Sequence, residues 1–353
     1  MDLIQKNELD PLFEILSLLY LCHNANWKEE AIQSLDEYGV KGEEFFRDHM
    51  KILETYVDTF KKYKKDGTED SFFFEQVSDE SFQLVVAMAV ENRYYYDHPG
   101  ETDRDWLRGC LAYLINDPQD HPHLPGEKDL PRLPDELAIL QFLDTADIKN
   151  EEKWHALNFL RKPDYWMTCL FDTVRANKDA YDRAIDAVKK PLDKLLKRAA
   201  VYEDAQFLKI AGTCADTPVI YLSLAAPLIL LVLYTHGYQG ILLEALRAED
   251  EPGKYSGEAV VRQAKSLSDK SKLDILCILK HTSMYNLELA EALGLSPSTT
   301  SHHMNTLLSS GFVTVEKKDG KVYYCLEKEN IAQFPAISNT TFYIRSEFSR
   351  LCD

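Results

Sequence analysis

The sequence ELAEALGLSPSTTSHHMNTLLSSGFV, residues 288–313, contains two short helical patterns separated by a glycine. The first pattern, 286–295, keeps its apolar residues on one face and ends at Gly294, where a helix C-terminus favours a left-handed residue. Ser296 and Pro297 then supply an N-cap and a proline at the first position of a second helix. A helix, a tight turn and a capped second helix predict a helix-turn-helix motif.

The following stretch, FVTVEKKDGKVYYCL at 312–326, predicts a β-hairpin. Its apolar residues alternate on both sides of Asp319-Gly320, a pair typical of two-residue hairpin turns. Lys317, Lys318 and Lys321 surround the tip. A helix-turn-helix followed by a basic hairpin is a winged helix, whose hairpin tip can reach phosphates or the adjacent minor groove.

Residues 259–330, called the C-terminal module below, resemble the ArsR/SmtB family of bacterial winged-helix repressors. The resemblance is carried by LSDKSKLDILCIL, ELAEALGLSPSTTSHHMNTLLSSGFV and DGKVYYCL, and it covers about a fifth to a quarter of the chain. It implies a cytoplasmic, homodimeric regulator that binds double-stranded operator DNA through its second helix and wing. The first 250 residues resemble only the large helical domains that precede the winged helix in some bacterial regulators, and this implies no ligand.

A helical wheel at 100° per residue divides residues 297–309 into two faces. The face predicted to pack inward holds Thr300, Met304, Leu307 and Leu308. The opposite face holds Ser298, His302, Asn305 and Thr306, with Thr299 and Ser301 beside it. Short hydroxyls, an amide and an imidazole suit a DNA groove, because each can exchange hydrogen bonds with phosphates and base edges without blocking approach.

The family resemblance implies a DNA-contacting role for Ser298, Thr299, Ser301 and His302. Asn305 joins them on the wheel, and the wing lysines 317, 318 and 321 complete the predicted interface. Pro297 is a departure, since many family members have glutamine at this position. We therefore expect a different operator preference.

Adjacent histidines at 302 and 303 raise the alternative of a metal site. Neighbours on a helix lie about 100° apart around its axis, so the two imidazoles cannot bind one ion together. His302 is predicted to face outward. For His303 we retain two interpretations, a partly buried structural histidine and a contact to the DNA backbone.

The family's usual metal positions lack metal ligands in this chain. Positions 285–287, which correspond to a Cys-x-Cys motif, read Tyr-Asn-Leu, and the tail 329–353 contains no histidine. Soft and borderline metals require thiolate or imidazole clusters. His98, His121 and His123 fall in an acidic, proline-rich region and are interpreted as solvated loop residues. The sequence therefore predicts no metal site and no cofactor.

The first 210 residues are predicted to be mostly helical. The 4-3-4-3 spacing of apolar residues in 43–60 indicates one amphipathic helix. A similar pattern in 179–210 contains Pro191, which should kink the helix or start a new one. Residues 97–135 are predicted to form loops around one short helix near 103–116.

The most hydrophobic run, VIYLSLAAPLILLVLY at 219–234, is too short and too interrupted for a membrane helix, which needs about 20 apolar residues. β-Branched and aromatic residues on both sides of Pro227 favour two buried strands near 218–235, in a small sheet or hairpin. The predicted fold is mainly α with small β elements. The predicted domains are a helical body at 1–250, a linker at 251–258, the winged helix-turn-helix at 259–330 and a tail at 331–353. Dimerisation and effector binding are the candidate roles of the body.

The net charge of −18 lies outside residues 265–330, where eight lysines balance eight acids. An acidic body beside a neutral module permits DNA binding when the body faces away, and it lowers non-specific affinity by repelling phosphate. Seven cysteines are scattered singly and the first residues, MDLIQKNELD, do not form a secretory signal pattern. Both features predict reduced thiols and a cytoplasmic protein without membrane insertion.

The common catalytic signatures GxGxxG, GxxxxGK[ST], GxSxG and HExxH are absent, so we expect a non-enzymatic protein. The favoured hypothesis is a homodimeric DNA-binding regulator, with room for a small-molecule effector in the body. Two alternatives stay open. One is a winged-helix adaptor that binds protein, and the other is an autoregulatory enzyme with its site in the N-terminal domain.

Overall fold

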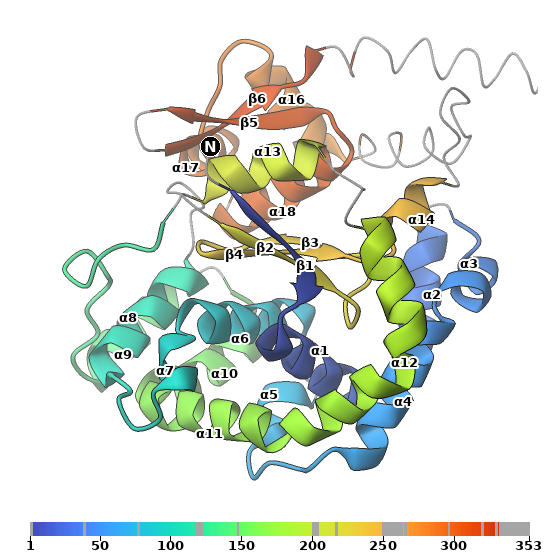
Figure 1. The fold of residues 1–353 in the computed structure, drawn as a ribbon. Helices are drawn as coiled ribbons and strands as arrows, with labels where there is room; N and C mark the ends of the chain where they lie inside the picture. Colours follow the sequence, from blue (N-terminus) through green and yellow to red (C-terminus); the bar gives the residue numbers. More distant parts are fainter. Residues whose placement is uncertain are drawn as a thin grey trace, which may run out of the picture. The chain divides into compact units, whose positions relative to one another are not determined.

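The structure is a computed structural model, and it describes residues 3–37, 40–75, 78–116, 123–146, 148–199, 205–215, 218–248, 264, 267, 269–295, 297–318, 321–328 and 331 (Figure 1). The chain divides into two compact units. Unit 1 comprises Met1–Trp27, Met50–Asp117 and His121–Leu243, and unit 2 comprises Lys28–His49, Pro118–Asp120 and Glu244–Asp353. The predicted linker at 251–258 lies outside the described residues. The sequence EAVVRQAKSLS, 258–268, predicts a helix before the helix-turn-helix, and most of these residues also lie outside the described part.

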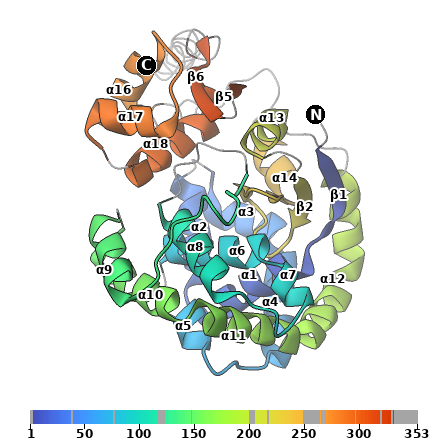
Figure 2. The same ribbon diagram turned by 90° about the vertical axis from the view of Figure 1, so that its left-hand side faces the viewer.

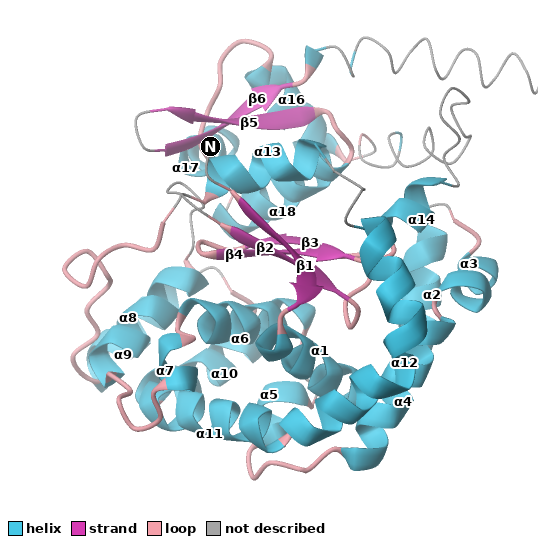
Figure 3. Ribbon diagram, viewed as in Figure 1, coloured by secondary structure: helices cyan, strands magenta, loops and turns pink. Residues whose placement is uncertain are grey.

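Helices dominate both units (Figure 3), which confirms the mainly α fold class with small β elements. The helices of unit 1 are α1 Pro11–His23, α4 Lys51–Tyr63, α5 Asp70–Phe74, α6 Asp79–Glu91, α7 Tyr94–Asp97, α8 Arg104–Ile115, α9 Glu136–Thr145, α10 Asn150–Arg161, α11 Pro163–Ala176, α12 Lys178–Ala199 and α13 Ala205–Cys214. Those of unit 2 are α2 Trp27–Glu37, α3 Gly42–His49, α14 Leu243–Ala248, α16 Lys270–Leu279, α17 Asn286–Leu293 and α18 Pro297–Ser309.

The central helix of unit 1 is α1, which contacts α4, α5, α6, α11 and α12 (Figure 2). A helix that is apolar nearly all round must be buried on every side. Accordingly, Leu12, Phe13, Ile15, Leu16, Leu18 and Leu19 are each no more than 2% exposed. Asp10 caps the helix by accepting a hydrogen bond from the backbone N–H of Leu12.

Unit 1 also contains a small four-stranded sheet with the order β1-β2-β4-β3. The strands are β1 Ile4–Leu9, β2 Val219–Ser223, β3 Leu230–Val232 and β4 His236–Gly240. β1, β2 and β4 are parallel neighbours, and β3 pairs antiparallel with β4. The prediction of strands within 218–235 is confirmed, but β2 and β3 do not pair with each other, and Leu230 of β3 is 41% exposed rather than buried.

The prediction of one amphipathic helix over 43–60 was wrong. The chain forms two helices, α3 and α4, with a break at Met50. Met50 and the apolar face of α4 are buried as expected, while Phe46 is half-buried and its neighbour Phe45 is buried instead. Periodicity identified the buried face of α4 but not the break. By contrast, α12 continues as one helix through Pro191.

A buried carboxylate joins α1 to the end of β2. Glu14 accepts hydrogen bonds from Ser223 Oγ at 2.7 Å and from the backbone N–H groups of Leu224 and Ala225, each at 3.1 Å. The Tyr56 hydroxyl donates a further bond at 3.0 Å. Burial outweighs these donors and raises the pKa of Glu14 from 4.5 to about 7.

Glu14 should make the stability of unit 1 depend on pH. The Glu14 carboxyl binds its proton more tightly in the folded chain than in the unfolded chain. Protonated Glu14 therefore contributes fully to the unfolding free energy below pH 4.5, and this contribution is lost as the pH rises through about 7. Relative to Glu14→Gln, the wild type should lose up to about 3 kcal/mol of unfolding free energy across this window. Urea denaturation of both proteins from pH 4.5 to 8 measures the difference, and a pH-independent difference would contradict the assignment.

Candidate nucleic-acid interface

Helices α16, α17 and α18 with the hairpin β5 Val313–Lys318 and β6 Lys321–Leu326 form the predicted winged helix-turn-helix. Gly294 follows α17 with φ 64°, and its N–H donates to the last turn of that helix. Only glycine adopts this left-handed conformation without a steric penalty from a Cβ atom. Proline 297 begins α18, as the sequence predicted.

The inward face of α18 agrees with the helical wheel. Thr300, Met304 and Leu307 are fully buried, and Leu308 is 8% exposed. These side chains belong to the same core as Leu289 and Ala290 of α17, which contacts α18. Because the buried stripe is defined, the face directed away from the core is defined as well.

Helix α16, the first helix of the module among the described residues, differs from its prediction in which side chains are buried. Asp269 caps α16 by accepting hydrogen bonds from the backbone N–H groups of Ser271 and Lys272. The sequence KSKLDILCILK, 270–280, predicts a helix whose apolar stripe is Leu273, Leu276 and Leu279. In the structure the buried residues of α16 are Ile275 and Leu279. Leu273 is 44% exposed. With apolar residues at 273, 275, 276, 278 and 279, the sequence alone does not distinguish the two possible faces.

The structure places the predicted contact residues on α18 and the wing. Thr299 is exposed, as predicted, and Thr306 is half-buried. The side chains of Ser298, Ser301, His302 and Asn305 are outside the described part of the structure, so their orientation toward DNA stays a prediction. Backbone positions of all four belong to α18, whose opposite face is buried.

His303 is half-buried and lies near the N-cap of α16. The backbone N–H of Lys272 is the main cause of the lowered pKa of Asp269, and the charge of His303 contributes to the same shift. This position favours the structural interpretation of His303.

The wing is a regular antiparallel hairpin, in register from Val313 opposite Leu326 to Lys318 opposite Lys321. One face is buried through Val313, Val315, Val322 and Tyr324. Lys317 and Lys318 are exposed, and Lys321 is half-buried. The predicted turn at 319–320 lies outside the described residues. Like charges directly opposite each other in a hairpin are unfavourable, so Lys318 and Lys321 together favour a bound anion.

The sequence did not predict the contact between the wing and the segment just before α17. Met284 bridges to Tyr324 of β6 through two backbone hydrogen bonds of 3.3 and 2.8 Å. The next residue, Tyr285, places its ring 3.9 Å from the Lys321 ammonium. This cation–π contact restrains Lys321 at the base of the turn. The pairing of a lone residue such as Met284 has no periodic pattern by which it could be predicted.

Among the described helices, none has the length and apolar character needed to cross a membrane.

Two comparisons with known proteins match this same region. A family model described as "Bacterial regulatory protein, arsR family" matches residues 269–315. The arsenical resistance operon repressor of Staphylococcus aureus is 36% identical over 80 residues, which are 22% of this chain and 77% of that protein. No solved structure matches the chain. Neither match extends over the N-terminal body. Through its C-terminal module, the chain belongs to the arsR family of bacterial regulatory proteins.

Proposed function

We propose that this DNA-binding regulator is a repressor that binds operator DNA as a homodimer, with α18 in the major groove and the wing on the adjacent backbone. The observation that carries the proposal is the buried stripe of α18, because it leaves the hydroxyl, amide and imidazole positions on the opposite face. A short helix with such a face, fixed to a basic hairpin, has the geometry of a recognition helix and wing. The repressor named among its relatives supports the direction of regulation.

The two elements would have different tasks. Ser298, Thr299, Ser301, His302 and Asn305 of α18 would contact base edges and nearby phosphates, which selects the sequence. Lys317, Lys318 and Lys321 would contact phosphates, which contributes affinity without selecting sequence. Positions 285–287 contain no cysteine, so control of this module through the family's thiolate site is not expected.

The proposal is tested by a gel shift with the full-length protein and the DNA upstream of its own gene. We expect a preference for that DNA over a scrambled duplex, and an affinity that falls steeply with salt because bound lysines release counterions from the phosphates. Light scattering of the complex gives the number of chains bound. Absence of both the preference and the salt dependence would instead support a protein-binding adaptor.

Lys321→Ala should weaken binding to every DNA sequence to a similar degree. If its ammonium contacts one phosphate, the slope of log affinity against log salt should become shallower by about one unit. The matched control is Lys189→Ala, which removes the same charge from an exposed position on α12 of unit 1. Equal slopes in Lys321→Ala and the wild type would exclude a phosphate contact at this position.

A further inference from the structure

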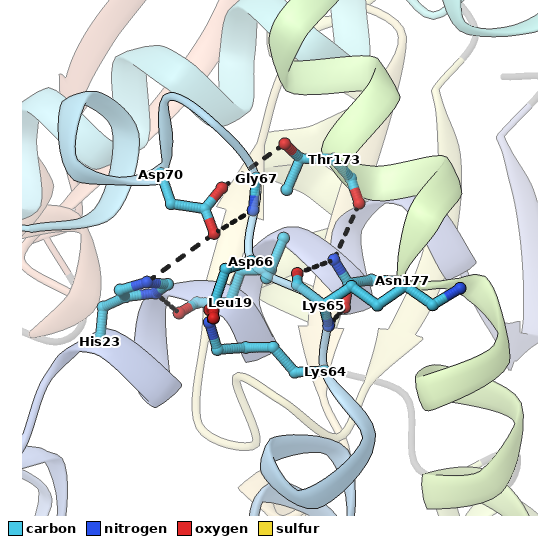
Figure 4. Close-up of polar contacts among 9 residues, drawn as sticks. All are labelled: Leu19, His23, Lys64, Lys65, Asp66, Gly67, Asp70, Thr173 and Asn177. Carbon is cyan, nitrogen blue, oxygen red and sulfur yellow. Dashed lines mark hydrogen bonds and ion pairs between the residues drawn. The ribbon is translucent and has the colours of Figure 1, made fainter.

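We propose that unit 1 contains a binding site for a divalent first-row transition-metal ion, formed by His23, Asp66 and Asp70 (Figure 4). His23 is the last residue of α1, Asp66 lies in the loop after α4, and Asp70 begins α5. One donor atom from each residue lies within 4.8 Å of the other two. The site is independent of the proposed DNA-binding function, since it stands on unit 1 alone.

The hydrogen bonding of His23 directs a lone pair into this cluster. Nδ1 lies 2.8 Å from the backbone carbonyl oxygen of Leu19. A carbonyl oxygen only accepts, so Nδ1 carries the proton and Nε2 of the neutral ring carries a lone pair. Metal-binding histidines are characteristically oriented in this way, with the other ring nitrogen donating to a carbonyl or carboxylate.

Nε2 of His23 faces the carboxylate of Asp70, with 3.9 Å between Nε2 and Oδ2. That separation is too long for a hydrogen bond. Both side chains are largely buried, with exposed fractions of 11% and 6%. Two buried electron-pair donors that face each other are stabilised by a cation between them. Metal–ligand bonds of about 2.0–2.2 Å allow two donors of one ion to lie up to about 4.3 Å apart. The 3.9 Å between Nε2 and Oδ2 is within this limit.

Asp70 is held rigidly but has little cationic compensation. It accepts hydrogen bonds from the backbone N–H of Gly67 at 2.9 Å and from the Thr173 hydroxyl at 3.5 Å. In the part of the chain that the structure describes, His23 is the basic side chain within 4.0 Å of this carboxylate. A Cβ atom at position 67 would lie 2.4 Å from Asp70 Oδ1, so glycine permits the close approach of this loop.

The loop that carries Asp66 is fixed from the other side by Asn177. Its amide nitrogen donates to the carbonyl oxygen of Lys65 at 2.9 Å, and its amide oxygen accepts from the N–H of the same residue at 2.8 Å. Asn177 is fully buried. The backbone on both sides of Asp66 is therefore positioned before any ion binds, which lowers the entropic cost of assembling the site.

Asp66 currently forms an ion pair with Lys64, which lowers the pKa of this carboxyl. The Asp66 side chain is 83% exposed, so it can turn from the ammonium to an ion without disturbing the core. Lys64 is thus a competitor of the metal. One imidazole and two carboxylates suit ions such as Mn²⁺, Fe²⁺ or Zn²⁺, with the remaining coordination positions left to water.

This proposed site differs from the sequence-based prediction of no metal site. That prediction rested on the family's usual metal-binding positions and on the loop histidines, and His23 belongs to neither group. The 42 residues between His23 and Asp66 leave no ligand spacing to detect in the sequence.

The test is a titration of the full-length protein with Mn²⁺, followed by the loss of the electron paramagnetic resonance signal of the free ion. Mn²⁺ is chosen because it prefers oxygen and nitrogen ligands over the cysteine thiols of this chain. We expect one ion per wild-type chain. His23→Gln and Asp66→Asn should each weaken binding by at least about tenfold, since losing even an outer partner of a metal ligand costs 10–100-fold.

Two further variants sharpen the test. His98→Gln should bind like the wild type, because exposed His98 has a similar Nδ1 contact to a backbone carbonyl, 2.9 Å from Tyr94, but lies outside the cluster. Lys64→Met should bind more tightly than the wild type, because it removes the competing ammonium. No saturable Mn²⁺ binding by the wild type, or wild-type affinity in His23→Gln or Asp66→Asn, would overturn the site and leave a histidine–aspartate ion pair.

Discussion

Replacing Met304 by alanine is expected to lower the unfolding free energy of the C-terminal module by about 2–5 kcal/mol. The side chain is fully buried on the inward face of α18, between helices and hairpin that form one small core. Truncation removes buried methylene groups and the thioether, and the small core can collapse only in part around the cavity. A module of this size has little stability to spare, so part of the population should be unfolded.

Hydrogen exchange of peptides from 286–326, read by mass spectrometry, measures this loss. Tryptophan fluorescence is unsuitable, because all four tryptophans precede residue 167. The matched control is Leu273→Ala on α16, which the structure shows to be 44% exposed. It should cost less than about 1 kcal/mol. A Leu273→Ala effect as large as that of Met304→Ala would place Leu273 on the buried face of α16, as the sequence-based stripe predicts.

His302→Ala is expected to weaken operator binding by about 1–3 kcal/mol while leaving the stability of the module unchanged. The sequence predicts that this imidazole lies on the face of α18 opposite the buried stripe, and a side chain on that face would affect DNA contacts and not the packing of the module. Ser298→Ala should act in the same direction with a smaller effect, because one hydroxyl makes fewer hydrogen bonds than a base-reading pair. Fluorescence anisotropy with labelled operator DNA gives both affinities.

The control for this prediction is His281→Ala, which removes an exposed histidine just beyond the end of α16. It should leave operator affinity unchanged. A loss of stability in His302→Ala comparable to that in Met304→Ala would show that the facing of α18 is misassigned. An unchanged affinity with unchanged stability would remove His302 from the interface.

The recognition helix was the part most accessible from sequence, for a physical reason. Helix α18 has 13 residues, and only one rotation about its axis buries all four of its inward apolar or hydroxyl residues. Gly294 ends the preceding helix and Pro297 marks the start of α18. On α16, by contrast, apolar residues lie on more than half of the circumference, so the packing against α17, α18 and β6 decides which are buried.

The helical body shows where periodicity stops being informative. Strand β1 has exposed residues along almost its whole length, so it lacks the alternation that predicts a strand. Its conformation depends on pairing with β2, more than 200 residues later. The His23, Asp66 and Asp70 cluster has the same origin, because packing of α1 beside α5 brings together residues that share no local pattern.

The pairing of β1 with β2 has a consequence for synthesis of the protein. Ile4 to Leu9 leave the ribosome long before Val219–Ser223, the strand with which they pair. The hydrogen bond from Ser223 to Glu14 also forms only after that later segment has been made. At 5–20 residues per second, that interval is about 10–40 seconds. During this interval, the strongly apolar α1 lacks some of the later segments that bury it in the folded protein. The nascent chain should therefore depend on chaperones until the strand following α13 has been made.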